Sequence, residues 1–263
     1  MKLMQGDCLV GMNELIKGNI KVDAIIVDLP YGTTQNKWDS VIPFEPMWEC
    51  IKKLRRDNTP IIMFAQIPFD KVLGYSNLKE LKYEWIWEKT QATGHLNAKK
   101  MPMKAHENIL VFYKKLPTYN PIKTTGHKPM NSGVRRSSLK NNNYNEINKV
   151  DLPFGGDTDR FPRTVLKFKS DKQLEYLHPT QKPVELLEYL IKTYTNDGDL
   201  VLDFTAGSFT TAIACLNTKR EFIGIELDET YFKIGTNRVE NHVKTLDYTP
   251  EISYDKVGGE KMC

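Results

Sequence analysis

The chain has 263 residues, which corresponds to one large domain or to one domain with a sizeable insertion. Its 40% hydrophobic and 27% charged residues exclude wholesale disorder and collagen-like repeats. The net charge of +4 is unevenly distributed, because residues 89–150 hold twelve Lys and Arg against two acids, which makes this segment +10 and the remainder −6. On charge alone, a segment that binds a polyanion and a merely solvated lysine-rich face are about equally favoured.

Other function classes are disfavoured by what the sequence lacks. No apolar run reaches the roughly 18 residues of a membrane span, and the N-terminal residues lack the apolar core of a signal peptide, so a cytoplasmic protein without a membrane partner is expected. The four cysteines form no Cys-x-x-Cys pair, which argues against a disulfide scaffold. The five histidines show no ligand spacing, so no metal is expected. A monomer and a homodimer both remain open.

Residues 1–113 alternate apolar runs with amphipathic stretches. The run at 22–28 ends in an acid followed by a leucine and a proline, which predicts a central strand that stops before the proline. Apolar residues at helical spacing predict a helix at 46–56. Further strands are expected at 60–64, 83–88 and 108–113.

Residues 114–170 have a different composition, rich in Asn, Thr, Pro, Gly, Lys and Arg and poor in periodicity. This composition predicts loops with short strands and poor order without a partner. Basic residues alternate with the aromatic residues Tyr119, Tyr144, Phe154 and Phe161, a mixture that suits phosphate contacts combined with base stacking. We therefore expect an inserted binding segment in preference to a linker.

An α/β pattern returns in residues 171–263. It predicts a helix at 184–194, a strand at 200–203, a loop at 205–208, a helix at 209–217, a strand at 221–226 and a helix from about residue 228. Such a succession predicts a doubly wound, mostly parallel α/β sheet of the Rossmann-like kind. In this interpretation residues 1–113 and 171–263 are two halves of one domain, interrupted by the segment 114–170.

The segment from Asp203 to Thr211 follows a strand and opens a helix, which is where nucleotide-type cofactors bind. It matches neither a glycine-rich dinucleotide loop nor a phosphate-binding P-loop. Glu226 ends the next strand, where an acid accepts hydrogen bonds from ribose hydroxyls. Acids at two strand ends without a diphosphate loop favour an S-adenosyl compound over NAD. The structural alternatives are a helix N-cap for Asp203 and a solvated strand-end acid for Glu226.

A second group of candidate residues, Asp28-Leu29-Pro30-Tyr31, lies at the end of the strand predicted at 22–28. The carboxylate and the Leu29 carbonyl could accept both N–H groups of an exocyclic amine and direct the nitrogen lone pair at an electrophile, while Tyr31 stacks on the ring. By itself this pattern is also found in ordinary strand exits, and that interpretation is at least as well supported. His106, Glu107, His95 and Lys89 are weaker candidates, for which a structural role is favoured.

Together the two groups of candidate residues resemble the β class of S-adenosylmethionine-dependent amino-group DNA methyltransferases. In that class an Asp-Pro-Pro-Tyr motif precedes the target recognition region and the cofactor loop comes last. The segment His178-Pro-Thr-Gln-Lys-Pro183, the loop at 203–211 and the strand ending at Glu226 match the family in this order. The resemblance covers residues 1–113 and 161–241. It implies transfer of a methyl group from S-adenosylmethionine to adenine N6 in double-stranded DNA, in a base flipped out of the helix.

The resemblance also implies roles for individual residues. The implied catalytic residues are Asp28, Leu29, Pro30 and Tyr31. The implied cofactor-binding residues are Asp7, Cys8, His178, Lys182, Asp203, Phe204, Thr205, Gly207, Ser208, Glu226 and Leu227. The candidate DNA-binding residues are Arg135, Arg136, Lys140, Arg160 and Arg163. For Arg135 and Arg136, a phosphate anchor or a solvated side chain is at least as well supported as contact with base edges.

The chain departs from the family pattern at several positions. Leu29 replaces a proline, and Phe209 replaces a glycine, where it is expected to narrow the loop around the cofactor. Asp28 resembles the adenine-modifying pattern, since the cytosine-N4 subgroup more often has serine there, but N4-cytosine methylation stays open. A catalytically inactive DNA-binding relative is a further alternative. Carbon-5 cytosine methylation is excluded because no cysteine follows a proline.

Overall fold

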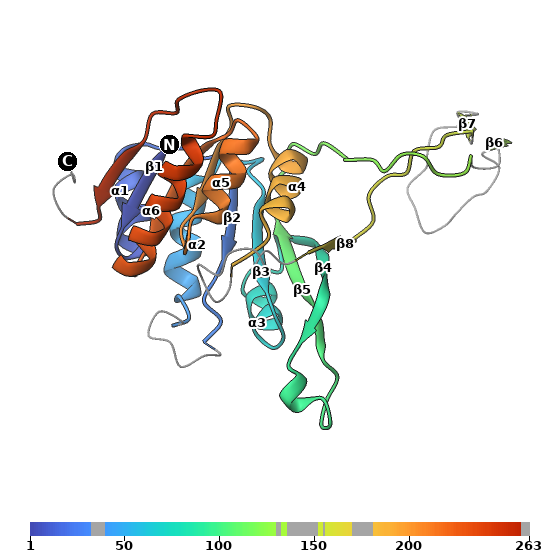
Figure 1. The fold of residues 1–263 in the computed structure, drawn as a ribbon, viewed down its shortest axis with the longest axis horizontal. Coiled ribbons are helices and arrows are strands. Elements are labelled where there is room, and N and C mark those ends of the chain that lie inside the picture. The colour runs from blue at the N-terminus through green and yellow to red at the C-terminus, as the bar shows by residue number, and fades with distance from the viewer. Residues whose placement is uncertain (33–39, 130–132, 136–151, 155, 170–180, 259–263) are drawn as a thin grey trace. The chain divides into compact units, whose positions relative to one another are not determined.

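A computed structural model of the chain describes residues 1–32, 40–129, 133–135, 152–154, 156–169 and 181–258 (Figure 1). It contains two compact units, Met1–Asn120 with Thr164–Cys263, and Pro121–Arg163. None of the helices in the described part of the chain combines the length and apolar character needed to cross a bilayer.

The larger unit holds a nine-stranded sheet in the order β11-β1-β10-β9-β2-β3-β5-β4-β8. The strands are β1 (Lys2–Gln5), β2 (Ala24–Asp28), β3 (Ile61–Ala65), β4 (Leu81–Thr93), β5 (Lys104–Phe112), β8 (Val165–Phe168), β9 (Leu200–Asp203), β10 (Glu221–Glu226) and β11 (Ser253–Lys256). Only β5 runs antiparallel to its neighbours, β3 and β4. The predicted α/β fold with a mostly parallel sheet is confirmed.

Helices cover both faces of this sheet (Figure 1). The helices are α1 (Cys8–Lys17), α2 (Phe44–Leu54), α3 (Phe69–Ser76), α4 (Val184–Tyr194), α5 (Thr210–Asn217) and α6 (Glu229–Val243), with a short 3-10 helix at His95–Asn97. Apolar residues of α1, α2 and α3 pack on one face, and those of α4, α5 and α6 pack on the other. Along β2, Ile25 and Val27 join the first layer and Ala24 and Ile26 the second. Burial on both faces explains the continuous apolar sequence of this strand.

The sequence-based elements agree with the structure at the centre of the sheet and deviate at its edges. The helix 184–194 and the strands 200–203 and 221–226 have the predicted bounds. The helix expected at 46–56 spans Phe44–Leu54 instead, which places its proline in the first turn, where no backbone N–H is needed. β4 and β5 are longer than expected because they continue past the sheet as a hairpin. The pattern did not reveal β1, α1, α3 or β11.

The smaller unit lies within the segment expected at 114–170. Its described strands, β6 (Gly133–Arg135) and β7 (Leu152–Phe154), pair antiparallel. Thr124 and Arg160 form an isolated bridge, with backbone hydrogen bonds of 3.0 and 2.8 Å. The unit is narrower than the compositional segment because β8 pairs with β4 in the large sheet. Tyr119, expected among the binding aromatics, itself belongs to the larger unit, where it packs on Tyr194.

Candidate active site

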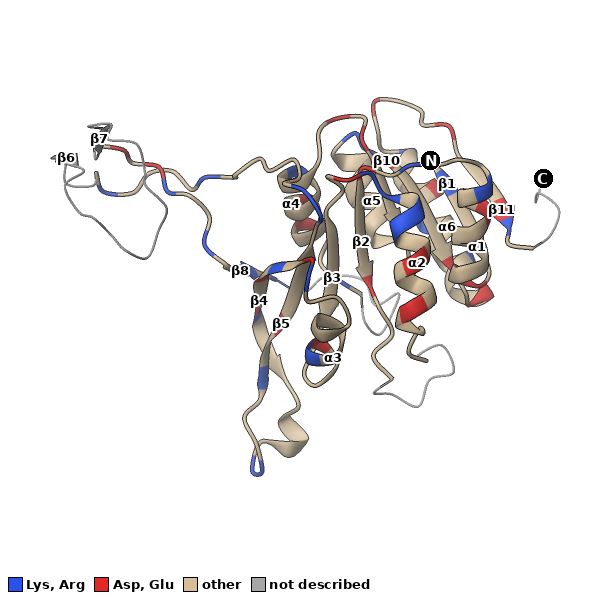
Figure 2. Ribbon diagram, turned by 180° about the vertical axis from the view of Figure 1, so that it is seen from behind, with Lys and Arg blue, Asp and Glu red and all other residues tan. Residues whose placement is uncertain are grey.

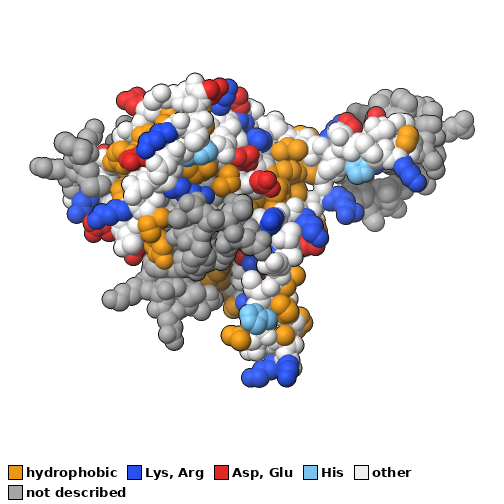
Figure 3. Space-filling model, viewed as in Figure 1, with side chains coloured by type: hydrophobic (Ala, Val, Ile, Leu, Met, Phe, Trp, Pro, Cys, Tyr) orange, Lys and Arg blue, Asp and Glu red, His pale blue; other side chains and the backbone are white. Residues whose placement is uncertain are grey.

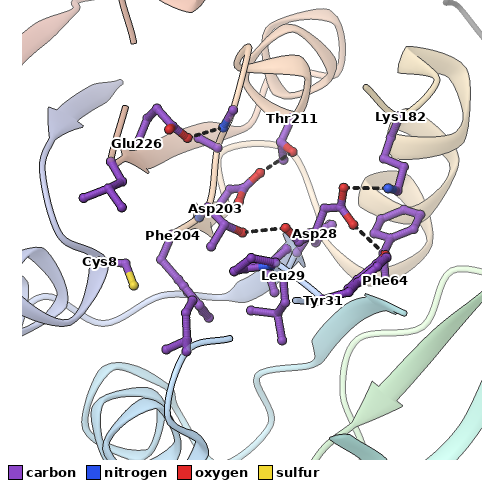
Figure 4. A pocket seen from close by; sticks show the side chains of 18 of the residues that line it. Cys8, Asp28, Leu29, Tyr31, Phe64, Lys182, Asp203, Phe204, Thr211 and Glu226 are labelled. Carbon is purple, nitrogen blue, oxygen red and sulfur yellow. Dashed lines mark hydrogen bonds and ion pairs between the residues drawn. The ribbon is translucent and has the colours of Figure 1, made fainter. Parts of the chain in front are cut away.

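A cavity of about 360 Å³ lies at the carboxyl ends of β2, β9 and β10 (Figure 4). β2 and β9 are neighbours in the sheet, but β2 continues through α2 to β3 on one side, whereas β9 continues through α5 to β10 on the other. Such a reversal of direction opens a crevice outside the strand ends, where doubly wound sheets bind ligands. The volume falls within the roughly 300–1,000 Å³ of small-molecule sites.

Asp28 ends β2 and lines the cavity. Its Oδ2 lies 2.5 Å from Nζ of Lys182, and its Oδ1 accepts a hydrogen bond of 2.8 Å from the Tyr31 hydroxyl. The Tyr31 ring packs on Phe69 with ring centroids 5.2 Å apart. Burial raises the pKa of Asp28, and the charge of Lys182 opposes this rise. The Leu29 side chain is buried in the core beneath the turn.

Asp203 ends the adjacent strand and organises the loop that follows it. Its Oδ1 accepts from the backbone N–H of Thr205 at 3.1 Å, and its Oδ2 accepts from the Thr211 hydroxyl at 2.6 Å. Asp203 therefore closes the loop and does not serve as the helix N-cap, a position that Phe209 occupies without a side-chain hydrogen bond. Burial raises the pKa of Asp203 to about 7.

The two groups of candidate residues predicted from the sequence are in direct contact. The Thr205 hydroxyl donates a hydrogen bond of 3.1 Å to the main-chain carbonyl of Asp28. Asp28 and Gly207 also line the same cavity. The loop after β9 is thus tied to the turn after β2, so that a ligand held by one lies beside the carboxylate of the other.

Glu226, at the end of β10, is held in a fixed orientation. Its Oε2 accepts from the backbone N–H of Gly207 at 2.7 Å, and its Oε1 accepts from that of Asp228 at 2.8 Å. Gly207 has a φ of +54°, a conformation that favours glycine. Each carboxylate oxygen retains a second lone pair, which a ribose hydroxyl could use. Burial raises the pKa of Glu226.

Phe209 turns away from the cavity, so the expectation that it narrows the cofactor loop is wrong. It adopts a φ of +56°, and its ring is fully buried against those of Phe222 and Phe232. Two glycines provide the space: a Cβ atom at Gly224 would lie 2.6 Å from the Phe209 ring, and one at Gly235 only 2.1 Å from it. The ring fills the core between the sheet and α6 because both neighbours lack a side chain.

The remaining predicted cofactor residues are distributed around the same cavity. Asp7 lines it and also caps α1 by accepting from two backbone N–H groups, at 2.9 and 3.0 Å. Burial raises the pKa of the neighbouring Cys8 thiol to about 12. The other cavity-lining members of the predicted set are Lys182, Phe204, Thr205, Ser208 and Leu227. His178 lies outside the described residues.

The cavity is acidic, because it brings together the four acids that the sequence analysis singled out. Among the described residues that line it, four are carboxylic acids (Asp7, Asp28, Asp203 and Glu226) and Lys182 is the one cation. Lys182 is already paired with Asp28. This electrostatic environment favours a cationic ligand and disfavours a phosphate. The described residues contain no group of His, Cys, Asp and Glu that could hold a metal ion.

Sequence reasoning also missed residues that surround Asp28. Phe64 and Gln181 line the cavity, and the Lys182 ammonium lies 5.2 Å from the centre of the Phe64 ring. Glu107, a weak candidate, lies 3.3 Å from Lys182 and 2.5 Å from Lys89. Phe64 could have been found as a residue near the carboxyl end of a strand adjacent to β2.

The described basic residues between 89 and 115, all in the larger unit, have different environments. Lys99, Lys100 and Lys104 are exposed on the β4–β5 hairpin, whose end combines basic, histidine and hydrophobic side chains (Figures 2 and 3). Lys114 and Lys115 both pair with Asp57, which offsets one of their two positive charges.

The candidate DNA-contacting arginines have different environments. The Arg160 guanidinium donates to backbone carbonyls of Lys128, Asp157 and Asp159, so it stabilises the smaller unit. Arg163 is exposed. Arg135 lies in β6, of which only the backbone is described, while Arg136 and Lys140 lie outside the described residues.

Comparison with known proteins gives a consistent set of matches. The profile of the N6/N4 DNA methylase family matches residues 22–237. The chain is 29% identical to the DNA adenine methyltransferase YhdJ of Escherichia coli over 90% of this chain and 82% of that protein. It is 28% identical to the type II methyltransferase M1.MboII of Moraxella bovis over 88% and 93% of the two chains. The crystal structure of the M1.HpyAVI–SAM complex superposes with a TM-score of 0.61 at 26% identity, covering 90% of this chain and all of the other.

Proposed function

Because the chain belongs to the N6/N4 DNA methylase family, we propose that it is a site-specific DNA methyltransferase that modifies the exocyclic N6 amine of adenine. The relatives YhdJ and M1.MboII, which align along most of the chain, support this activity, and YhdJ is an adenine methyltransferase by name. The methyl donor is S-adenosylmethionine, which M1.HpyAVI binds in its crystal structure.

One observation carries the proposal: a carboxylate and a ligand-binding loop meet at the switch point of the sheet. The Asp28 main chain is hydrogen-bonded to Thr205 of the loop, and both border one cavity. Methyl transfer requires the acceptor amine and the donor side by side, since holding two reactants in the correct geometry provides much of the catalytic effect.

The residues present fit S-adenosylmethionine. Glu226 is oriented to accept hydrogen bonds from ribose hydroxyls, and the apolar side chains of Leu9, Phe204 and Leu227 border the cavity for a heterocycle. The excess of carboxylates complements a sulfonium cation. When bound, S-adenosylmethionine supplies an electrophilic methyl group.

Asp28 and the Leu29 carbonyl then act on the acceptor base. They accept the two N–H groups of the amine, which draws its lone pair out of conjugation and directs it at the methyl carbon. With the donor bound, the lone pair directed in this way would form the nitrogen–carbon bond as the carbon–sulfur bond gives its electrons to sulfur. The negative charge of Asp28 stabilises the positive charge that develops on nitrogen, and the proton leaves to Asp28 or to solvent. Tyr31 contributes its ring as a stacking surface.

DNA is the macromolecular substrate of this family. We assign target recognition to residues 121–163 and phosphate contacts to exposed basic side chains such as Arg163. A flipped base must be extracted from the helix at a cost of a few kcal/mol. The protein is expected to act in the cytoplasm, where its DNA substrate is found, as a monomer or a homodimer.

The test uses unmodified DNA and labelled S-adenosylmethionine, followed by sequencing for the modified base. The expected result is N6-methyladenine in one short sequence context. Asp28→Ala should abolish transfer while S-adenosylmethionine still binds, and the exposed Asp247→Ala should leave transfer unchanged. N4-methylcytosine would instead support the cytosine-directed activity, and DNA binding without label would indicate an inactive relative. Label transfer that survives Asp28→Ala would refute the mechanism.

A further inference from the structure

A chain of alternating charges leads from the hairpin strands to Asp28. Lys89 on β4 lies 2.5 Å from Oε1 of Glu107 on β5. Oε2 of Glu107 lies 3.3 Å from Lys182, in the segment before α4, and Lys182 lies 2.5 Å from Oδ2 of Asp28. The side chains of Lys182 and Glu107 are each 7% exposed. Two ammonium groups and two carboxylates thus form a largely buried row that ends at the predicted catalytic acid, and Figure 4 shows the Lys182–Asp28 pair at that end.

Neither cofactor binding nor stability explains this arrangement. The resemblance assigned Lys182 to the cofactor, yet its ammonium lies between two carboxylates and over the Phe64 ring. Buried ion pairs are frequently no more stabilising than apolar side chains of similar volume, because desolvation offsets the attraction. A row of four such groups beside a reaction centre therefore calls for a role in the reaction.

We propose that Lys182 is a positioning residue for the methyl transfer, one that fixes Oδ2 of Asp28 and holds this carboxylate in its ionised form, with Glu107 and Lys89 tuning its effect. The proposal rests on the proposed function of the same site. With Oδ2 fixed by Lys182, Oδ1 is the oxygen that can exchange the Tyr31 hydroxyl for the N–H of a target amine.

The charges around Asp28 explain why a cation is needed there. The groups that face it are Lys182, Glu107, Tyr31 and Asp203, with Lys89 behind Glu107. Burial raises the pKa of Asp28, the charge of Lys182 lowers it, and the charge of Glu107 raises it. Burial raises the pKa of Glu107 too, but the two lysines overcome this and bring it to about 2. Without Lys182, Asp28 would sit near two other acids and take up a proton.

The decisive variant is Lys182→Met, which shortens the side chain by only one atom and removes its charge. We expect the acid limb of the kcat–pH profile to move up by about 1–3 pH units. We expect kcat on the acid side of the profile to fall by about tenfold for each pH unit that the limb moves, with recovery at higher pH, and the Kd for S-adenosylmethionine to stay within about threefold. Lys182→Arg should restore the wild-type profile. Lys233→Met, which breaks an exposed ion pair on α6, is the matched control and should change nothing.

For Glu107→Gln we expect the acid limb to shift in the direction opposite to that for Lys182→Met. A general loss of stability would not produce opposite shifts. Removing this negative charge should move the acid limb to lower pH, because Glu107 raises the pKa of Asp28. This variant also keeps the proposal testable if Lys182→Met does not fold.

Two results would overturn the proposal. One is a Lys182→Met enzyme that loses affinity for S-adenosylmethionine while keeping the wild-type pH profile at saturation, which would make Lys182 a cofactor ligand. The other is an acid limb that Glu107→Gln leaves in place or moves to higher pH.

A measurement without DNA separates this inference from the proposed function. Carbon-13 NMR titration of labelled aspartates, with Asp28→Asn used for assignment, reports the ionisation of Asp28 directly. If the Asp28 pKa from this titration rises in Lys182→Met and falls in Glu107→Gln, the result supports the proposed role of the charge chain, even in a protein that methylates no DNA. Absence of DNA methylation would refute only the proposed function. An Asp28 pKa that stays the same in both variants of an active enzyme would refute only the role of Lys182.

Discussion

Gly235→Ala tests the packing that allows Phe209 to turn away from the cavity. A Cβ atom at residue 235 would lie 2.1 Å from Cδ2 of Phe209, whereas ordinary carbon contacts are about 3.5–4.0 Å. The ring is fully buried and cannot move aside without disturbing Phe222 and Phe232. Overpacking destabilises a protein by about 1–3 kcal/mol, and a clash of this severity lies at the upper end of that range. The better helix propensity of alanine offsets about 1 kcal/mol of this loss. We expect a net loss of about 2 kcal/mol in the free energy of unfolding.

The assay is urea unfolding followed by circular dichroism, arranged as a double-mutant cycle. In a Phe209→Ala background, itself about 3–5 kcal/mol less stable, the clash is gone and Gly235→Ala should be neutral or stabilising by up to about 1 kcal/mol. The coupling between the two sites is then about 2–3 kcal/mol.

The matched control is Gly74→Ala in α3, where the nearest atom to the new Cβ lies at 3.4 Å, an ordinary contact. This substitution should be neutral or slightly stabilising. If Gly235→Ala lowers the free energy of unfolding equally in the wild-type and Phe209→Ala backgrounds, the explanation that Gly235 makes room for the Phe209 ring is refuted. Because the ring faces away from the cavity, the folded variants should bind S-adenosylmethionine as the wild type does.

Three further expectations concern the cavity itself. Thr205→Val removes the hydrogen bond to the Asp28 carbonyl and should lower kcat by up to about tenfold with little change in KM for S-adenosylmethionine, as steady-state kinetics will show. Tyr31→Phe keeps the ring and removes the hydroxyl, so it should lower kcat far less than Tyr31→Ala; equal losses would contradict a stacking role. Thr211→Val removes a donor to Asp203, whose pKa of about 7 is raised by burial, so that the folded state holds this proton more tightly than the unfolded state does. Losing this donor to the ionised carboxylate raises the folded-state pKa of Asp203 further, so the loss of stability, about 1.5–3 kcal/mol, should be complete only above that higher pKa and should shrink as the pH falls towards 7. Thermal unfolding in an Asp203→Asn background should show no such pH dependence.

The elements at the centre of the sheet were predictable because their burial is complete. A strand covered on both faces must be apolar throughout, and the helix at Val184–Tyr194 shows its buried stripe in the residue spacing. The edge strand β11 and its neighbour β1 are short and form only by pairing with distant segments, so no local pattern marks them. The hairpin extension of β4 and β5 likewise depends on pairing between distant segments.

The sequence by itself determined the fold class, the order of the motifs and the positions of Asp28, Asp203 and Glu226 at strand ends, because these features follow from local periodicity and from residue types next to one another. Only the tertiary structure decided what those acids contact. Lys182 reaches Asp28 across 154 residues of chain, and Phe209 turns into the core because Gly235, 26 residues later, leaves a space there. Such contacts arise from the packing of separate segments against one sheet, which is not encoded in the neighbourhood of any single residue.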